Sequence, residues 1–270
     1  RVEPGAALSV AEERLSGGDE LLYGIARRER RGGASYDPDF LNLGTPAAEI
    51  AASLERWKNA SEPGRRGVNL LFHGAPGTGK TAFAIYLAES LGFQPIVKRY
   101  GDLVSAWVGE TEKAIRAAFR EAEGTVLVFD EVDSLLASRE GATNSWERTQ
   151  ANEVLTCMED FKGIFIASTN FGTILDVASL RRFTFKVEFR PTAPDRRRRL
   201  VESYFPGIEM DGAAWGELEA LDSLTPGDVA TAADRLRLVS IADSARVLAA
   251  LKEEITSREP WDLVESCVLV

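Results

Sequence analysis

The chain has 270 residues, of which 44% are hydrophobic and 27% charged, as is typical of a globular protein with a packed core. Its formal net charge of −10 argues against a large basic surface for nucleic acid, and no apolar run is long enough to span a membrane. The two cysteines, Cys157 and Cys267, are far apart, which indicates a reducing compartment, and we expect a cytoplasmic protein.

Residues 1–40 form the least patterned part of the chain. Several glycines are mixed there with the charged run from Arg27 to Arg31, so we expect an irregular N-terminal segment or linker. The charged run is typical of a solvated linker, and a docking segment is the alternative. Because the first residue is Arg1 rather than Met, we also expect the chain to be a piece of a longer protein.

From residue 41 onward, hydrophobic periodicity predicts alternating helices and strands, and then helices alone. The predicted strands are Val68–Phe72, Pro95–Arg99, Val126–Phe129, Ile164–Ser168 and Phe183–Phe189. The predicted helices are 46–58, 80–91, 112–122, 144–158, 195–204, 226–238 and 242–255. The alternation predicts an α/β fold: an αβα sandwich with a parallel five-stranded sheet in residues 41–190, followed by a small helical subdomain in residues 191–270.

A glycine-rich loop follows the first predicted strand. Gly74-Ala75-Pro76-Gly77-Thr78-Gly79-Lys80-Thr81 matches the phosphate-loop pattern GxxxxGK[ST]. Its glycines let backbone N–H groups approach phosphate oxygens, and the following helix directs its positive end at them. We expect Lys80 to contact the β- and γ-phosphates and the Thr81 hydroxyl to bind Mg²⁺. The loop predicts a P-loop NTPase; a glycine turn without a ligand is the alternative, and His73 beside it is expected to be structural.

Two carboxylates follow the apolar strand at residues 126–129. Asp130 lies at its carboxyl end, where parallel sheets bind ligands, and is expected to hold Mg²⁺ through water. Glu131 is placed to polarise the water that attacks the γ-phosphate. Either residue alone could instead cap a helix. No N-K-x-D motif for guanine follows, so ATP is favoured over GTP.

Residues 66–238 resemble the AAA proteins, the hexameric branch of AAA+ ATPases that includes the katanin and spastin group and the proteasomal ATPases. The phosphate loop with its Pro76 and the acidic stretch from Asp130 to Leu135 are similar to the motifs of that family, in the same order. The resemblance implies a Mg²⁺-dependent, ATP-hydrolysing module with a helical lid. It also implies a homo-oligomeric ring, a hexamer, that remodels a protein substrate or translocates it through a central pore.

Two further segments take their meaning from this resemblance. Trp107, Val108 and Gly109 resemble the family's first pore loop, in which a large ring grips polypeptide. A core position for Trp107 is the alternative. Asn170, after the strand at residues 164–168, resembles the sensor residue that hydrogen-bonds the attacking water or the γ-phosphate, although an Asn at a strand end also forms turns.

Arginines follow in the segment that resembles the family's arginine fingers. Arg181 and Arg182 would stabilise transition-state charge in a neighbouring subunit. The spacing is tighter than in the family, and Arg182 before Phe183 is the safer match. In the lid, Asp228 stands where the family has a small residue. Arg235 and Arg237 are candidates for a sensing arginine, but a surface role fits them equally well, so neither is assigned. The run from Arg196 to Arg199 is expected to be solvated or to face a neighbouring subunit.

Two other functions remain open from the sequence. An AAA+ motor or loader for nucleic acid would need basic channel loops, yet Glu110 is the charge nearest Trp107. A nucleotide-gated switch or scaffold would not need Glu131, Asn170 and Arg182 together. Protein remodelling is therefore favoured; the sequence does not indicate which protein is the substrate.

Overall fold

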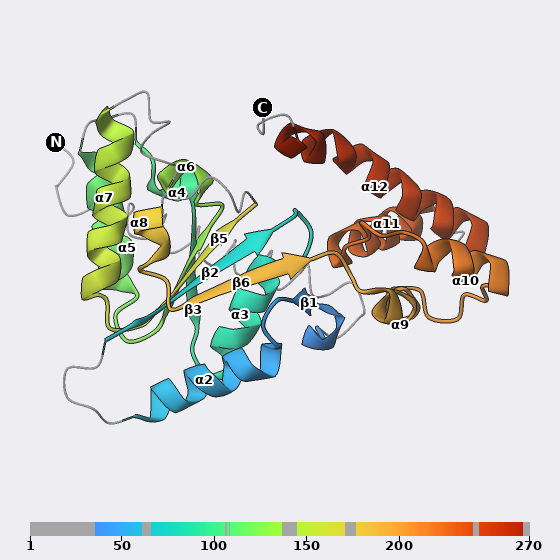
Figure 1. Ribbon diagram of the computed structural model, residues 1–270, viewed down its shortest axis with the longest axis horizontal. Coiled ribbons are helices and arrows are strands. Elements are labelled where there is room, and N and C mark those ends of the chain that lie inside the picture. Colours follow the sequence, from blue (N-terminus) through green and yellow to red (C-terminus); the bar gives the residue numbers. More distant parts are fainter. Residues whose placement is uncertain are drawn as a thin grey trace, which may run out of the picture. The chain divides into compact units, whose positions relative to one another are not determined.

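The computed structural model describes residues 36–60, 66–105, 107, 109–136, 145–170, 177–239 and 243–266. Among these residues, six strands form one sheet in the order β1-β6-β2-β5-β4-β3 (Figure 1). The strands are β1 (Asn42–Leu43), β2 (Val68–Gly74), β3 (Pro95–Arg99), β4 (Val126–Asp130), β5 (Ile164–Thr169) and β6 (Phe185–Arg190). β2 pairs parallel with β5, β5 with β4 and β4 with β3.

The predicted α/β class is confirmed, and the sheet has one strand more than the five expected. The extra strand, β1, is the outermost strand beside β6 and pairs with it antiparallel. It has only two residues, so it is too short to produce an alternating hydrophobic pattern. The Asn42 side chain donates to the Pro191 carbonyl oxygen over 2.9 Å and so adds to this pairing.

Helices occupy the positions that the periodicity indicates. The longer helices are α2 (Ala47–Asn59), α3 (Lys80–Ser90), α5 (Glu110–Glu121), α7 (Ser145–Asp160), α9 (Pro194–Tyr204), α11 (Pro226–Val239) and α12 (Ser244–Ser266). The shorter ones, which were not predicted, are η1 (Pro38–Phe40), α4 (Tyr100–Leu103), α6 (Asp133–Leu136), α8 (Val177–Leu180) and α10 (Gly212–Glu219). α12 continues well beyond its predicted end at Ile255. No helix in the described ranges is long and apolar enough to cross a membrane.

The chain divides into two compact units. Their described parts come from Thr45–Gly74 and Lys80–Glu188 in the first unit, and from residues 36–44, Ala75–Gly79 and residues 189–266 in the second. The short segment Ala75–Gly79 is thus grouped with the helices that follow the sheet. The predicted domain boundaries, at residues 40 and 190, stay a proposal, and residues 1–35 of the predicted N-terminal segment lie outside the described part.

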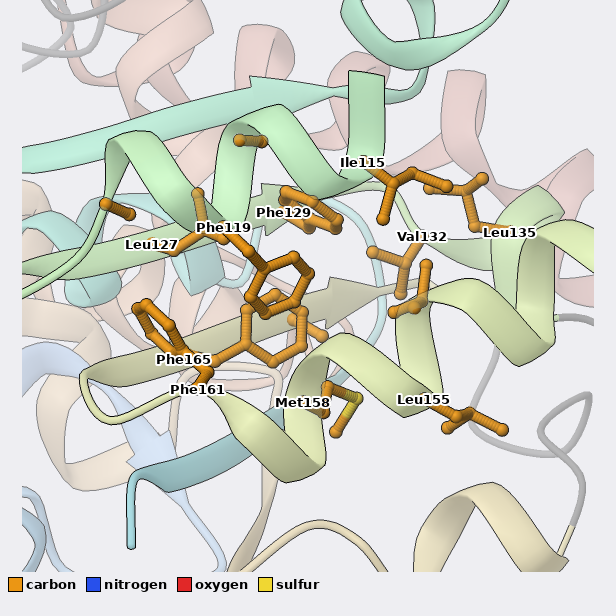
Figure 2. Packing of buried hydrophobic residues seen from close by; sticks show 14 of the residues in the cluster. Ile115, Phe119, Leu127, Phe129, Val132, Leu135, Leu155, Met158, Phe161 and Phe165 are labelled. Atoms are coloured by element: carbon orange, nitrogen blue, oxygen red, sulfur yellow. The ribbon is translucent and has the colours of Figure 1, made fainter. Parts of the chain in front are cut away.

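The core of the first unit fills both faces of its central strands, as expected for a covered parallel sheet. On one face, four phenylalanine rings meet (Figure 2). The ring centroid of Phe119, on α5, lies 5.5 Å from that of Phe129, 5.3 Å from that of Phe161 and 5.0 Å from that of Phe165. Residues on the opposite face of the same strands, such as Val128 and Ile166, are also fully buried. Buried packing on both faces keeps the strand ends in a constant register.

The second unit has a separate apolar core formed by α9, α10, α11 and α12. One arginine of the run at residues 196–199 is buried in this unit, so the expectation that the whole run is solvated or faces a neighbouring subunit is wrong for that residue. The Arg197 side chain is 3% exposed and donates to the carbonyl oxygens of Thr192 and Glu219. The hydrogen bond to the Thr192 carbonyl is buried, so that carbonyl needs a donor within the protein, and the long guanidinium can reach both carbonyls.

Candidate functional site

Parallel pairing brings Asp130, Glu131 and Asn170, which lie at or directly after the ends of β4 and β5, to one edge of the sheet. Arg182 does not join them, because its carbonyl accepts from the Asn69 side chain near the start of β2. His73 of β2 pairs with Thr169 of β5, and Arg99 of β3 pairs with Asp130 of β4. Because β2, β3, β4 and β5 run in the same direction, their carboxyl ends share this edge. Ligands of open α/β sheets bind at such an edge.

Asp130 is the centre of a compact hydrogen-bond network at this edge. Its Oδ1 accepts from the Thr81 hydroxyl over 2.8 Å and from the Ser168 hydroxyl. Arg99 Nε lies 3.9 Å from Asp130 Oδ2. The Asp130 side chain is only 10% exposed, so these contacts hold its carboxylate in one orientation.

Glu131 has an unusual backbone conformation. Its φ is +59°, the left-handed region that a non-glycine residue rarely adopts. The Glu131 N–H donates to Ser168 Oγ over 3.2 Å, and the Val132 N–H donates to the Ser168 carbonyl over 2.9 Å. β5 therefore holds this turn through Ser168, and the turn leaves the Glu131 side chain exposed while Asp130 is buried. Strained backbone held in this way is common at functional sites.

Lys80 and Thr81 begin helix α3 in the same unit. Lys80 Nζ donates to the Gly74 carbonyl over 2.7 Å, so the side chain folds back toward the end of β2. Burial lowers the pKa of Lys80 to about 8, against the opposing effect of Asp130, Asp133 and Glu131. Asn170 is half-buried directly after β5, and the neighbouring Thr169 hydroxyl donates to Asp133 Oδ1.

The loop residues Ala75, Pro76, Gly77, Thr78 and Gly79 belong to the second unit. Gly77 and Gly79 have φ values of +78° and +95°, which favour glycine. A Cβ on Gly77 would lie 2.7 Å from Thr225 Oγ1, and one on Gly79 would lie 2.9 Å from Leu41 Cδ2. The Gly227 N–H donates to the Gly77 carbonyl over 2.8 Å, and the Thr78 hydroxyl donates to the Ala75 carbonyl, also over 2.8 Å.

Trp107 of the predicted pore loop is 79% exposed, so the alternative that placed it in the core is wrong. The Trp107 backbone N–H donates to Ser105 Oγ over 3.3 Å, and the Ser105 backbone N–H donates to Thr111 Oγ1 over 3.0 Å. These bonds connect the loop to the start of α5. Gly109 has φ +84° and precedes α5 directly. Val108 lies outside the described residues.

The two predicted fingers differ in exposure and contacts. Arg182 Nε lies 2.7 Å from Glu159 Oε1, and its side chain is 30% exposed. Arg181 is exposed. The preceding stretch of this motif, residues 171–176, lies outside the described part. Arg182 is therefore bound to α7 within its own subunit, a contact it would have to exchange to act as a finger.

Sequence reasoning did not identify the roles of Ser168 and Arg258. The Ser168 hydroxyl donates to Asp130, and the Arg258 guanidinium donates to the Pro76 carbonyl of the loop. Ser168 was part of the predicted sensor strand, but nothing in that pattern shows that its hydroxyl contacts Asp130. Of the two lid arginines named above, Arg235 pairs with Glu253 and Glu254, and Arg237 pairs with Asp234; a sensing role for either remains a prediction. Arg258 lies beyond the predicted end of its helix, and no motif marks it.

The paired oxygens of Thr81 and Asp130 fit Mg²⁺, which prefers hard oxygen ligands. Together with a glycine loop that follows a parallel strand and precedes a helix, they define the class as a P-loop NTPase. Residues 70–191 match the model of the ATPase family associated with various cellular activities (AAA). The chain belongs to the AAA family of AAA+ ATPases.

The comparisons also identify similar proteins. ATP-dependent zinc metalloprotease FtsH 3 of Conexibacter woesei is 30% identical over 94% of this chain and 36% of its own length. Ribosome biogenesis ATPase RIX7 of Saccharomyces cerevisiae is 34% identical over 67% of this chain and 23% of its own length. One chain in the E. coli MS115-1 HORMA:CdnC:Trip13 complex superposes with TM-score 0.60 at 16% identity, covering 85% of this chain and 91% of that one, which shows the fold alone. The chain thus spans about a third or less of these two curated relatives.

Proposed function

We propose that the chain is the motor module of a cytoplasmic, ring-forming ATPase that uses ATP hydrolysis to remodel or translocate a protein substrate. The AAA module itself is shown by the family match. The ring, the pore and the substrate class are proposed. Support comes from the site residues at the sheet edge and, for the substrate class, from the Trp107 loop.

The residues at the sheet edge have separable chemical roles. The exposed Glu131 carboxylate accepts a proton from the attacking water, and the Asn170 amide orients that water or the γ-phosphate. Lys80 supplies positive charge to the β- and γ-phosphates. Thr81 would hold Mg²⁺ directly and Asp130 through water; the ion, when bound, neutralises charge on the phosphate oxygens. Ser168, on β5, donates to the Asp130 carboxylate and accepts from the Glu131 backbone N–H, and so holds both residues in place.

The exposure of the Trp107 side chain is the observation on which the proposal of a protein substrate rests. A tryptophan side chain that is 79% exposed presents a large apolar surface that a substrate can contact. The flanking residues Glu110 and Lys113 pair with each other over 2.7 Å, so the start of α5 presents little net positive charge to a nucleic acid. An indole ring can pack against many side chains, as contact with varied polypeptide requires.

The test of this choice is Trp107→Ala, with Leu238→Ala as the matched control because Leu238 is 87% exposed at the end of α11. Turnover is measured alone, with an unfolded protein, and with single-stranded DNA or RNA. We expect the stimulation by unfolded protein to be lost in Trp107→Ala and kept in the control. Both variants should melt close to wild type, because surface substitutions change stability by about 0.5 kcal/mol or less. Stimulation by nucleic acid alone would overturn the proposal.

The proposed ring is tested through Arg182 and Arg181. Arg182→Ala should lower turnover by about 10³-fold if its guanidinium acts across a subunit interface. Mixing Arg182→Ala with Lys80→Ala subunits should restore part of the activity, because some interfaces then combine an intact Lys80 with an intact Arg182. Arg181→Ala in the same mixture identifies the main finger. Turnover per subunit that does not change with concentration, with no rescue, would contradict the ring.

A further inference from the structure

Arg258, on helix α12, contacts the phosphate loop within the second unit. One terminal nitrogen, Nη1, donates to the Pro76 carbonyl over 3.2 Å and to Thr225 Oγ1 over 3.1 Å. The other, Nη2, donates to the Ser223 carbonyl. Nη1 also lies 3.3 Å from Asp228 Oδ2, and the Arg258 side chain is only 11% exposed. This residue is therefore a buried link between the loop and the helices of its unit.

The start of helix α11 holds the next residue of the loop. Thr225 and Asp228 cap this helix reciprocally: the Thr225 N–H donates to Asp228 Oδ2 over 2.8 Å, and the Asp228 N–H donates to Thr225 Oγ1 over 3.3 Å. The cap places the Gly227 N–H against the Gly77 carbonyl at 2.8 Å. Two consecutive carbonyls of the loop, those of Pro76 and Gly77, are thus held by donors from distant helices.

Because the peptide group is planar, the direction of each of these carbonyls also fixes the direction of the N–H group that follows it. In a trans peptide the C=O of one residue and the N–H of the next point in opposite directions. A Pro76 carbonyl directed at Arg258 therefore directs the Gly77 N–H away from α12. The Gly77 carbonyl likewise directs the Thr78 N–H away from α11. Phosphate loops bind phosphate oxygens through such N–H groups.

We propose that Arg258 is a positioning residue that presets the N–H groups of Gly77 and Thr78 for the phosphates of a nucleoside di- or triphosphate. The inference rests on the proposed nucleotide binding and adds a role for α12. A lysine could keep the ion pair with Asp228 but lacks the planar fork that reaches Pro76, Thr225 and Ser223 together. Arg258 acts on affinity and not on the chemical step, because its contacts are to the loop backbone and to the cap of α11.

The experiment measures ADP·Mg affinity by calorimetry for wild type, Arg258→Ala, Arg258→Lys and Arg246→Ala. Arg246 is the matched control, because it lies on the same helix, is half-exposed and pairs only locally with Asp243. We expect the dissociation constant to rise about tenfold or more in Arg258→Ala, several-fold in Arg258→Lys and not at all in the control. KM for ATP should rise in parallel, with kcat changing far less. The amide resonances of Gly77 and Thr78 should shift in both Arg258 variants.

Each outcome bears on the proposal. Unchanged affinity with unchanged Gly77 and Thr78 amides would overturn it, even if the melting temperature fell, because Arg258 would then be only structural. If Arg258→Ala does not fold, Arg258→Lys decides: wild-type affinity overturns the proposal, and weaker binding with shifted amides supports it. A wild-type chain that binds no ADP would instead refute the proposed function, and this inference with it.

Discussion

The residues expected to contact nucleotide occur in two regions that are stabilised in different ways. At the sheet edge of the first unit, the contacts are made by side-chain hydroxyls: those of Thr81 and Ser168 both donate to the Asp130 carboxylate, and the Ser168 hydroxyl accepts from the Glu131 backbone N–H. In the second unit, the loop Ala75–Gly79 is held through its backbone carbonyls by Gly227 and Arg258. We infer that substitutions at Glu131 and Ser168 in the first region change turnover, and that substitutions that displace the loop in the second region change affinity.

The largest expected effect separates turnover from affinity at the sheet edge. Glu131→Gln keeps the shape of the side chain but removes the proton acceptor, so turnover should fall about 10²- to 10⁴-fold while ADP affinity stays near wild type. Steady-state ATPase assays and calorimetry measure the two quantities. Glu202→Gln, which alters a surface pair with Arg198, is the control and should change neither. Normal turnover in Glu131→Gln would move the base elsewhere, with Asp133 the next candidate.

The loop provides the opposite test. A Cβ on Gly227 would lie 2.7 Å from the Gly77 Cα, so Gly227→Ala must displace the loop backbone. We expect ADP affinity to fall about tenfold or more and stability to fall by about 1–3 kcal/mol, as overpacking does. Gly216→Ala is the matched control, because a Cβ there meets no atom within 4 Å and a helical alanine should be neutral or slightly stabilising. Wild-type affinity in Gly227→Ala would break the distinction between the regions.

Ser168→Ala sharpens the comparison, because the Ser168 hydroxyl acts on the site through the Asp130 carboxylate and the Glu131 backbone N–H. Removal of its hydroxyl leaves Asp130 and the left-handed turn at Glu131 with one partner fewer. We expect turnover to fall about tenfold, with KM for ATP changing much less. The control is Ser90→Ala, whose hydroxyl donates only to Leu87 of its own helix. A rise in KM with unchanged kcat would instead assign Ser168 to binding.

The smallest expected effect is a pH dependence of binding that comes from Lys80. Burial lowers its pKa to about 8 in the free protein, and bound phosphates, being anionic, raise it again. Well below pH 8 the amine is already mostly protonated, so nucleotide binding adds almost no proton to it. Above pH 8, binding of ADP·Mg should take up a fraction of a proton, and affinity should fall as pH rises. Calorimetry at pH 7 and pH 9 in buffers of different ionisation enthalpy measures this uptake, and equal uptake at both values would contradict it.

The sequence by itself determined the local features of this protein. The phosphate-loop motif, the apolar strand before Asp130 and Glu131, and most helices and strands follow from short-range patterns, because glycine spacing and hydrophobic periodicity act over a few residues. The fold class was predicted in this way, the family was predicted from the resemblance of the motifs, and both are confirmed. The roles of the individual site residues remain predictions.

Only the tertiary structure decided which distant groups hold those motifs. Ser168 meets Asp130 because β4 and β5 pair in one register, and no local pattern encodes that contact. Arg258 is 182 positions from Pro76 in the sequence, and it reaches the loop only because α11 and α12 pack in the same unit. The exposure of Trp107 and the burial of Arg197 were likewise decided by packing, because residue type alone favours the opposite for each.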